Sequence, residues 1–184
     1  MVRAAVLVSG GGTNLQAIID AKQAGKIPSA ELALVVASNA SAYALTRAEN
    51  AGIAHAVLRK EKGEAPENYG ERLLTLLREN AIDVVVLAGF LTILPENVIR
   101  AYDHRILNIH PSLIPSFCGD GFYGLHVHEA ALKRGVKVTG ATVHFVNEIT
   151  DGGDIIAQKA VEVLPGDTPE TLQRRVMEQA EWIL

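Results

Sequence analysis

The segment from residue 108 to residue 115, Asn-Ile-His-Pro-Ser-Leu-Ile-Pro, carries an amide and an imidazole side by side at the end of a predicted strand, 105–109. Side chains two residues apart in a strand point to the same side, so we expect Asn108 and His110 to face one ligand. The amide can donate a hydrogen bond to a developing oxyanion, and the imidazole can donate while it passes a proton. The two prolines predict a rigid segment in which an X-Pro bond can be cis. A buried structural histidine is the alternative for His110. We favour function because open α/β sheets bind ligands at the carboxyl ends of their strands.

A carboxylate partner for this pair is offered by the loop 147–154, which contains Asp151 followed by two glycines. Asp-Gly-Gly is common in turns and has no functional meaning by itself. If the loop folds toward the strand ends, Asp151 would face His110, hold one tautomer and raise the pKa of the imidazole. His144, on the preceding strand, is a weaker candidate for the same cleft.

The loop Ser-Gly-Gly-Gly-Thr-Asn, residues 9–14, follows the first predicted strand and precedes a helix. Glycines let the backbone approach a ligand, and the N–H groups at a helix start favour anions. The loop is not a Walker A motif, because it lacks Gly-Lys-Ser/Thr. It is not a complete dinucleotide fingerprint either, because Ala37-Ser38-Asn39 stands where the second strand would supply an acidic residue. We therefore favour the phosphate of a mononucleotide-like ligand; a tight turn that needs glycine only for its geometry is the alternative.

Two other interpretations of the reactive side chains are less favoured. A metal site could be built from His110, His144, Asp151 and the histidines at 126 and 128, but these last two are two residues apart at a predicted helix start and would not share a face. No His-Glu-x-x-His spacing is present. Cys118 lies in the glycine-rich segment 117–124 without an adjacent base, so we expect it not to be a nucleophile.

Strands and helices alternate along the first two thirds of the sequence and place these motifs. Apolar runs predict strands at 4–8, 32–37, 55–58, 83–88 and 105–109, and helices lie between them, the last opened by Pro95 as its first residue. This order predicts a doubly wound, mostly parallel α/β sheet. The segments 137–146 and 155–163 have no room for a helix between them and predict a C-terminal antiparallel hairpin. A final helix begins near Thr168-Pro169 and is still periodic at Leu184.

Length and composition restrict the class of protein. The chain has 184 residues, 48% of them hydrophobic and 21% charged, which predicts one folded domain over 1–184 and excludes global disorder. A net charge of -4 without a basic block argues against nucleic-acid binding. No apolar run approaches the length of a membrane span. The single cysteine cannot form an internal disulfide, which fits a reducing compartment, and we expect a cytoplasmic protein.

Five segments in one order and spacing resemble the phosphoribosylglycinamide formyltransferase family of folate-dependent enzymes in purine biosynthesis. The segments are Ser-Gly-Gly-Gly-Thr-Asn-Leu-Gln (9–16), Asp-Val-Val-Val-Leu-Ala-Gly-Phe (83–90), Leu-Asn-Ile-His-Pro-Ser-Leu-Ile-Pro (107–115), Val-Thr-Gly-Ala-Thr-Val-His-Phe-Val (138–146) and Asp-Gly-Gly (151–153). The resemblance implies transfer of the formyl group of 10-formyltetrahydrofolate to the amine of glycinamide ribonucleotide, with no metal. The expected partners are these two small molecules and a second copy of the chain in a homodimer. Neither nucleic acid nor a membrane is expected as a partner.

The same resemblance implies roles for individual residues. Gly12, Thr13 and Asn14 would hold the phosphate of the ribonucleotide, and Glu181 would meet its amine. Asn108, His110 and Asp151 would be the catalytic residues, with a protonated His110 and Asn108 stabilising the tetrahedral oxyanion. The folate pocket would be lined, largely through backbone groups, by Leu91, Thr92, Ile93, Leu94, Asn108, Asn147 and Thr150.

The chain departs from the family's pattern at several places. Pro66 and Thr92 stand where some relatives carry basic residues, and the segment 118–124 is longer than the Pro-Gly of many members. Placing Glu181 requires a one-residue gap, and members generally continue past Leu184, so the resemblance implies a C-terminal end that is truncated.

Other families share the Asn-x-His-Pro-Ser-Leu-x-Pro motif: methionyl-tRNA formyltransferases, sugar formyltransferases and formyltetrahydrofolate hydrolases. The methionyl-tRNA formyltransferases resemble the chain less, because the sequence has no basic C-terminal domain. The formyltetrahydrofolate hydrolases usually carry an extra N-terminal domain. A nucleotide-sensing module without turnover is the non-enzymatic alternative. It would not need the trio Asn108, His110 and Asp151.

Overall fold

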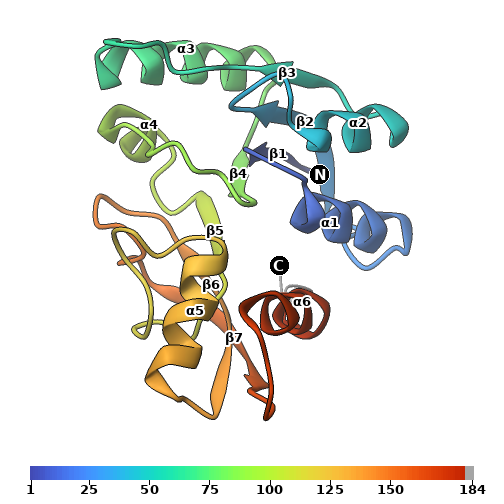
Figure 1. Cartoon of the computed structure of the whole chain (residues 1–184). Coiled ribbons are helices and arrows are strands. Elements are labelled where there is room, and N and C mark those ends of the chain that lie inside the picture. The colour runs from blue at the N-terminus through green and yellow to red at the C-terminus, as the bar shows by residue number, and fades with distance from the viewer. Residues whose placement is uncertain (181–184) are drawn as a thin grey trace. The chain divides into compact units, whose positions relative to one another are not determined.

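The protein is described from a computed structural model of the whole chain, in which the structure of residues 1–180 is defined (Figure 1). Two compact units can be distinguished, Met1–Leu107 and Asn108–Leu184, and each is described by itself. The predicted fold class is confirmed. The first unit alternates parallel strands with helices, the second contains the predicted antiparallel hairpin, and residues 1–180 contain seven strands. None of the helices within residues 1–180 is long and apolar enough to cross a membrane.

The first unit is built on a parallel sheet with the strand order β3-β2-β1-β4. Its apolar strands are buried along most of their length, as expected for a parallel sheet covered on both faces. Helices α1 and α2 pack against each other, as do α3 and α4. The elements are β1 (Val2–Val8), α1 (Thr13–Gln23), β2 (Ala30–Ala37), α2 (Tyr43–Asn50), β3 (His55–Val57), α3 (Pro66–Glu79), β4 (Val84–Leu87) and α4 (Glu96–Ala101).

Prolines lie at the starts of helices α3 and α4, and the start of α4 differs from the sequence prediction. Pro95 is not the first residue of α4 but its N-cap, with ψ at 152°, and its carbonyl accepts the first bonds of the helix, from the N–H groups of Val98 and Ile99. Helix α3 begins at Pro66, because proline has the backbone angle that a first helical residue needs.

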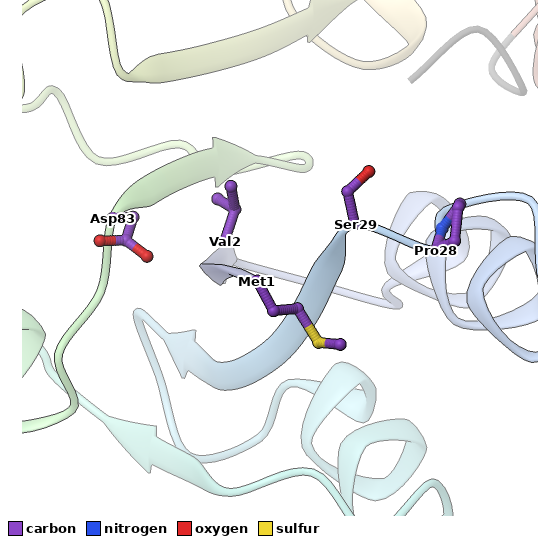
Figure 2. Close-up of a pocket in the computed structure, with 5 residues that line it drawn as sticks. All are labelled: Met1, Val2, Pro28, Ser29 and Asp83. Carbon is purple, nitrogen blue, oxygen red and sulfur yellow. The ribbon is translucent and has the colours of Figure 1, made fainter.

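The two edges of this parallel sheet differ. Figure 2 shows a surface hollow at the edge where β1, β2 and β4 begin, lined by Met1, Val2, Pro28, Ser29 and Asp83. The loops that carry the sequence motifs follow the opposite ends of the same strands, after Val8, Ala37 and Leu87. The motifs therefore lie at the carboxyl edge, where open α/β sheets bind ligands.

The second unit has its own core. Strand β5 (Ile106–His110) enters it from the first unit, and α5 (Leu125–Arg134), β6 (Val138–Phe145), β7 (Ile155–Glu162) and α6 (Pro169–Ala180) follow. Strands β6 and β7 pair antiparallel from Val138 opposite Glu162 to His144 opposite Ile155. Helix α6 begins at Pro169, and the Thr168 hydroxyl accepts the N–H of Thr171 as a cap. The apolar core consists of Ile109, Ala131, Ala141, Val143, Val161, Leu172 and Val176.

Candidate active site

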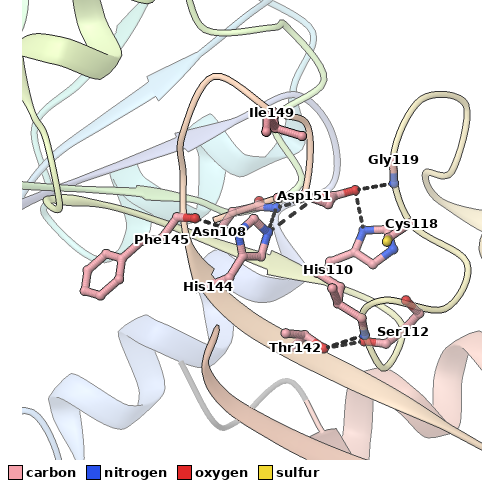
Figure 3. A network of polar contacts seen from close by, with 12 residues as sticks. Asn108, His110, Ser112, Cys118, Gly119, Thr142, His144, Phe145, Ile149 and Asp151 are labelled. Carbon is pink, nitrogen blue, oxygen red and sulfur yellow. Dashed lines mark hydrogen bonds and ion pairs between the residues drawn. The ribbon is translucent and has the colours of Figure 1, made fainter. Parts of the chain in front are cut away.

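The predicted catalytic side chains of the second unit lie in one cluster around Asp151 (Figure 3). His110 Nδ1 lies 3.5 Å from Asp151 Oδ2, and Asn108 Nδ2 lies 3.5 Å from Asp151 Oδ1. The strand therefore turns Asn108 and His110 toward the same carboxylate, as their spacing predicted. Asp151 and His110 are both almost completely buried, with side-chain exposures of 9% and 5%. The cluster thus places a desolvated carboxylate beside a desolvated imidazole.

His144 also belongs to this cluster. Its Nδ1 lies 2.8 Å from the Phe145 carbonyl oxygen, which can only accept, so Nδ1 carries a proton. Its Nε2 lies 3.1 Å from Asn108 Nδ2 and 3.4 Å from Asp151 Oδ1. His144 Nε2 therefore lies between the Asn108 amide and the Asp151 carboxylate, and the Asn108 NH₂ group is turned toward both His144 and Asp151.

The backbone of the segment 117–119 completes the cluster from the other side. The Phe117 carbonyl lies 2.8 Å from His110 Nε2, so this nitrogen donates, and the Gly119 N–H donates to Asp151 Oδ2 at 2.9 Å. Because the His110 proton is on Nε2, Nδ1 is the ring atom that is free to accept a proton beside the carboxylate. The sequence interpretation missed both contacts, since they are made by backbone groups whose positions do not depend on a recognisable side chain.

The electrostatics of His110 correct one expectation. Burial lowers the pKa of the imidazole below its ordinary value, and the Asp151 charge and the Phe117 carbonyl oppose this without reversing it. Asp151 therefore acts on the pKa in the predicted direction, but desolvation outweighs it, and the resting imidazole is neutral. For Asp151, burial acts to raise the pKa, yet contacts with His144, the Gly119 N–H and His110 together hold it below its ordinary value. The carboxylate is ionised.

The turn after His110 is fixed to strand β6 by the Thr142 hydroxyl. Thr142 Oγ1 donates to the Ser112 carbonyl at 2.7 Å and accepts the Ile114 N–H at 3.1 Å. The bond between Ile114 and Pro115 is cis, one of the two isomers allowed for in the sequence interpretation. These contacts hold the segment that follows His110 on the same strand that carries His144.

The remaining histidines and the cysteine do not join the cluster's contacts. Within residues 1–180, no group of three or more His, Cys, Asp or Glu side chains is arranged to hold a metal ion. His126 and His128, both in α5, point to different sides, since the first is exposed and the second is 1% exposed. The Cys118 thiol donates to the Pro115 carbonyl, and burial and the nearby Asp151 charge raise its pKa. A raised pKa disfavours the reactive thiolate.

The glycine loop of the first unit is a second candidate site, built mainly from backbone. Gly12 precedes α1 with φ at 72°, and a Cβ atom there would lie 2.7 Å from the Ala44 Cβ, so only glycine fits this position. No acidic side chain lies in the first turn of α1, and Thr13 is exposed and Asn14 half-buried. The loop and the helix start are therefore open to an anion.

Ser9 connects this loop to the neighbouring strand ends. Its hydroxyl contacts the Ser38 hydroxyl at 2.8 Å and accepts the Leu91 N–H at 2.9 Å. The carbonyl of Ser9 accepts from Asn39 Nδ2 at 2.8 Å. Asn39 and the more distant Arg47, whose Nε donates to the Gly11 carbonyl at 2.7 Å, were not singled out as site residues from the sequence.

The residues expected to line a folate pocket lie in two loops, one in each unit. In the first unit Leu91 and Ile93 are 64% and 80% exposed, while Thr92 is half-buried and Leu94 is buried. In the second unit Asn147 Oδ1 accepts the Ile149 N–H, and Thr150 and Ile149 are exposed. Both loops thus present apolar side chains to solvent. Glu181 lies outside the residues that the structure describes.

The sequence and the fold are similar to those of known formyltransferases. A family model described as "Formyl transferase" matches residues 2–184. The chain is 41% identical over 179 residues to a phosphoribosylglycinamide formyltransferase of Haemophilus influenzae, covering 97% of the chain and 82% of that protein. It is 40% identical to the chloroplastic phosphoribosylglycinamide formyltransferase of Arabidopsis thaliana, covering 95% of the chain but only 60% of that protein. The crystal structure of glycinamide ribonucleotide transformylase 1 from Symbiobacterium toebii has a TM-score of 0.92 at 42% identity, covering 100% of the chain and 84% of that structure.

Proposed function

Because the chain belongs to the formyl transferase family, we propose that it transfers the formyl group of 10-formyltetrahydrofolate to the amine of glycinamide ribonucleotide, a step of purine biosynthesis. The observation that carries the proposal is the convergence of Asn108, His110 and His144 on the buried Asp151. This is the set of groups that a formyl transfer needs: a hydrogen-bond donor for an oxyanion, a base, and a carboxylate that stabilises the protonated base. The family match and the geometry of this cluster both support this function.

The ribonucleotide phosphate is assigned to the glycine loop, with Gly12, Thr13 and Asn14 as its binding residues. The open N-terminus of α1 and the N–H groups of the loop favour a dianion without a basic side chain in the first turn. The net charge of -4 makes such local donors necessary, because the overall field does not attract an anionic substrate. Glu181 is retained as the residue proposed to meet the substrate amine.

The chemical step follows from the protonation states in the cluster. The substrate amine attacks the formyl carbon, a C–N bond forms, and the formyl oxygen becomes an oxyanion. The amine proton passes, through water, to the neutral His110 at Nδ1, where the Asp151 carboxylate 3.5 Å away stabilises the new charge. His110 then returns this proton to the leaving folate nitrogen as its bond to the formyl carbon breaks. The products are the formylated ribonucleotide and tetrahydrofolate.

Asn108 is proposed to bind the oxyanion. One N–H of its amide is directed to His144 Nε2 at 3.1 Å, whereas its contact with Asp151, at 3.5 Å, is at the limit of a hydrogen bond. The second N–H can therefore turn to an oxyanion at small cost. The sequence interpretation gave His110 a proton before the reaction; the neutral resting ring instead assigns the first stabilisation of the oxyanion to Asn108.

Contacts with the folate cosubstrate are proposed for two sets of residues, each in its own unit: Leu91, Thr92, Ile93 and Leu94 in the first, and Asn108, Asn147 and Thr150 in the second. Each of these two loops exposes apolar side chains. This supports binding of a flat aromatic ligand, because burying such side chains against a ring is favourable. No metal takes part in the proposed step. We also propose that the protein works in the cytoplasm, where its one thiol stays reduced, and a homodimer stays a prediction.

An absorbance assay that follows conversion of 10-formyltetrahydrofolate to tetrahydrofolate tests the function. We expect turnover with glycinamide ribonucleotide that exceeds the rate with water alone by at least about a thousandfold, as positioning of two substrates provides. Turnover without the ribonucleotide would instead identify a hydrolase. Binding of the ribonucleotide without turnover would identify a sensing module, and either result would overturn the proposal.

A further inference from the structure

The first three carbonyl groups of the glycine loop, those of Ser9, Gly10 and Gly11, all bond to one neighbouring segment, residues 39–47. The Ser9 carbonyl accepts from Asn39 Nδ2 at 2.8 Å, and the Gly10 carbonyl accepts the Ala44 N–H at 3.2 Å. The Gly11 carbonyl accepts from Arg47 Nε at 2.7 Å. Three successive carbonyls are thus held on one side of the loop by donors from β2's end and from helix α2.

The direction of these carbonyls determines the direction of the next N–H groups. In a trans peptide the N–H points away from the C=O of the preceding residue, and the only cis bond within residues 1–180 is the one before Pro115. The N–H groups of Gly10, Gly11 and Gly12 therefore point away from the segment 39–47. None of the three has a hydrogen-bond partner in the described part of the chain. Three adjacent N–H groups with this common direction form an anion-binding concavity.

We infer that Asn39 and Arg47 are positioning residues of the phosphate loop: they hold its carbonyls back so that its N–H groups face the ligand. The inference rests on the proposed function, which assigns the substrate phosphate to this loop. Neither residue needs to touch the phosphate. Without the two side-chain bonds, the flexible glycines can turn a carbonyl oxygen toward the anion, which repels it.

Both side chains are themselves fixed for this task. Asn39 Oδ1 accepts from the Ser41 hydroxyl at 2.8 Å and the Ser41 N–H at 3.1 Å, so Nδ2 is left for the Ser9 carbonyl. The Arg47 guanidinium lies over the Tyr43 ring, 5.0 Å from its centroid, and Nη1 donates to Gln16 Oε1 at 3.1 Å. Among residues 1–180 no carboxylate is in contact with the Arg47 guanidinium, so no ion pair within that range neutralises its charge beside the loop.

The test compares Asn39→Asp and Arg47→Met with wild-type protein. Asn39→Asp keeps the shape and the acceptor for Ser41 but replaces the donor with an oxygen that repels the Ser9 carbonyl. We expect each variant to raise the KM for glycinamide ribonucleotide, and the inhibition constant of inorganic phosphate, by about tenfold or more, while kcat and the KM for the folate change by less than about threefold. Arg47→Lys, which retains a donor for Gly11, should recover most of the loss.

Matched controls come from the same unit. Asn80→Asp removes an amide that donates to the Leu76 carbonyl at 2.8 Å, and Arg72→Met removes a guanidinium that lies over the Tyr69 ring and donates to the Arg59 carbonyl at 2.8 Å. Both should leave phosphate inhibition unchanged. If Asn39→Asp does not fold, Asn39→Ala, which adds no charge, replaces it.

The outcomes separate this inference from the proposed function. Site variants that bind inorganic phosphate as tightly as the controls would overturn the positioning role, whatever the enzyme's activity. If wild-type protein does not formylate the ribonucleotide, the proposed function is wrong, but calorimetry with inorganic phosphate on the same variants still decides whether Asn39 and Arg47 hold the loop.

Discussion

In the first unit, the buried side chains within residues 1–107 are apolar apart from the hydroxyls of Tyr69 and Tyr102, whereas the second unit buries imidazoles and hydroxyls among residues 108–180. The buried polar residues of the second unit are His110, Ser112, His128, Thr139, Thr142 and His144. In the first unit the polar groups proposed for function are backbone N–H groups of an exposed loop. In the second unit they are desolvated side chains that can gain or lose a proton.

This difference indicates that the first unit binds the substrate phosphate and the second unit carries out the chemical step, a division of function between the two units. Backbone N–H groups do not titrate, so a phosphate held by the glycine loop should bind equally well across the pH range in which the phosphate keeps its charge. Side chains removed from water have shifted pKa values, and their chemistry must depend on pH. We therefore expect substitutions in the loop to change binding, and substitutions in the cluster to change turnover.

The strongest test of this division is removal of the titratable group of His110 or Asp151. His110→Ala or Asp151→Asn should lower kcat by at least about a hundredfold, because each removes a proton acceptor or its stabilising charge. The Kd for glycinamide ribonucleotide, measured by calorimetry, should change by less than about threefold.

The matched control is Asp154→Asn, the same change at an exposed position three residues further along the loop. It should have wild-type turnover. If His110→Ala kept wild-type turnover, the assignment of chemistry to the second unit would be wrong, and if it lost ribonucleotide binding instead, the two functions would not be separable.

The second prediction uses His128, a buried imidazole that the proposed reaction does not need. Burial and then the charge of His110 lower its pKa to about 4, and its Nδ1 has no hydrogen-bond partner. When the pH falls below the ordinary pKa of histidine, His128 becomes protonated in the unfolded chain but stays neutral in the folded chain. The folded state is therefore fully favoured near pH 7 and loses stability as the pH falls toward 4. This side chain alone should lower the free energy of unfolding by about 2 kcal/mol between pH 7 and pH 5.

Denaturant unfolding of His128→Leu at both pH values measures this contribution. The variant should lose about 2 kcal/mol less than wild-type protein on acidification, and its stability at pH 7 should change little because an unpaired polar atom is removed. His126→Leu, at an exposed position of the same helix, should keep the wild-type pH dependence. Equal slopes for His128→Leu and wild type would contradict a buried neutral imidazole.

The sequence alone predicted the parts of this arrangement that repeat along the chain or lie close in it. Continuous apolar runs identified the parallel strands, and the alternation along β5 placed Asn108 and His110 on one side, where the structure finds both beside Asp151. The hairpin followed from the absence of a helix between two strands. These predictions depend on local periodicity, which the core enforces.

What could not be predicted depends on contacts between distant segments. Asn39 and Arg47 bond carbonyls 30 and 36 residues away, and no local pattern indicates such a bond. The net pKa direction of His110 depends on how completely it is buried, which its neighbours in sequence do not determine. The ring's proton is placed by the Phe117 carbonyl, a group present in every residue.

The smallest expected effect comes from the backbone contact that joins the loop 117–124 to Asp151. Gly119 and Gly121 both have positive φ, 90° and 83°, and a Cβ atom at either would meet nothing within 4 Å. Alanine should therefore cost each position a similar backbone penalty. Only Gly119 donates to Asp151, so Gly119→Ala, by displacing that N–H, should lower kcat about tenfold while Gly121→Ala leaves it unchanged.

The pH profile of kcat shows whether this effect acts through Asp151. The Gly119 N–H helps to hold the pKa of Asp151 down, and loss of the bond should raise that pKa. The acid limb of the profile for Gly119→Ala should then move to higher pH, because the carboxylate is protonated sooner as the pH falls, while Gly121→Ala should keep the wild-type limb. The division between the units predicts that neither change alters the KM for the ribonucleotide. A rise in that KM with an unshifted acid limb would show that the loop 117–124 contributes to ribonucleotide binding. Backbone groups of the second unit would then bind the substrate as well, and binding would not be confined to the first unit.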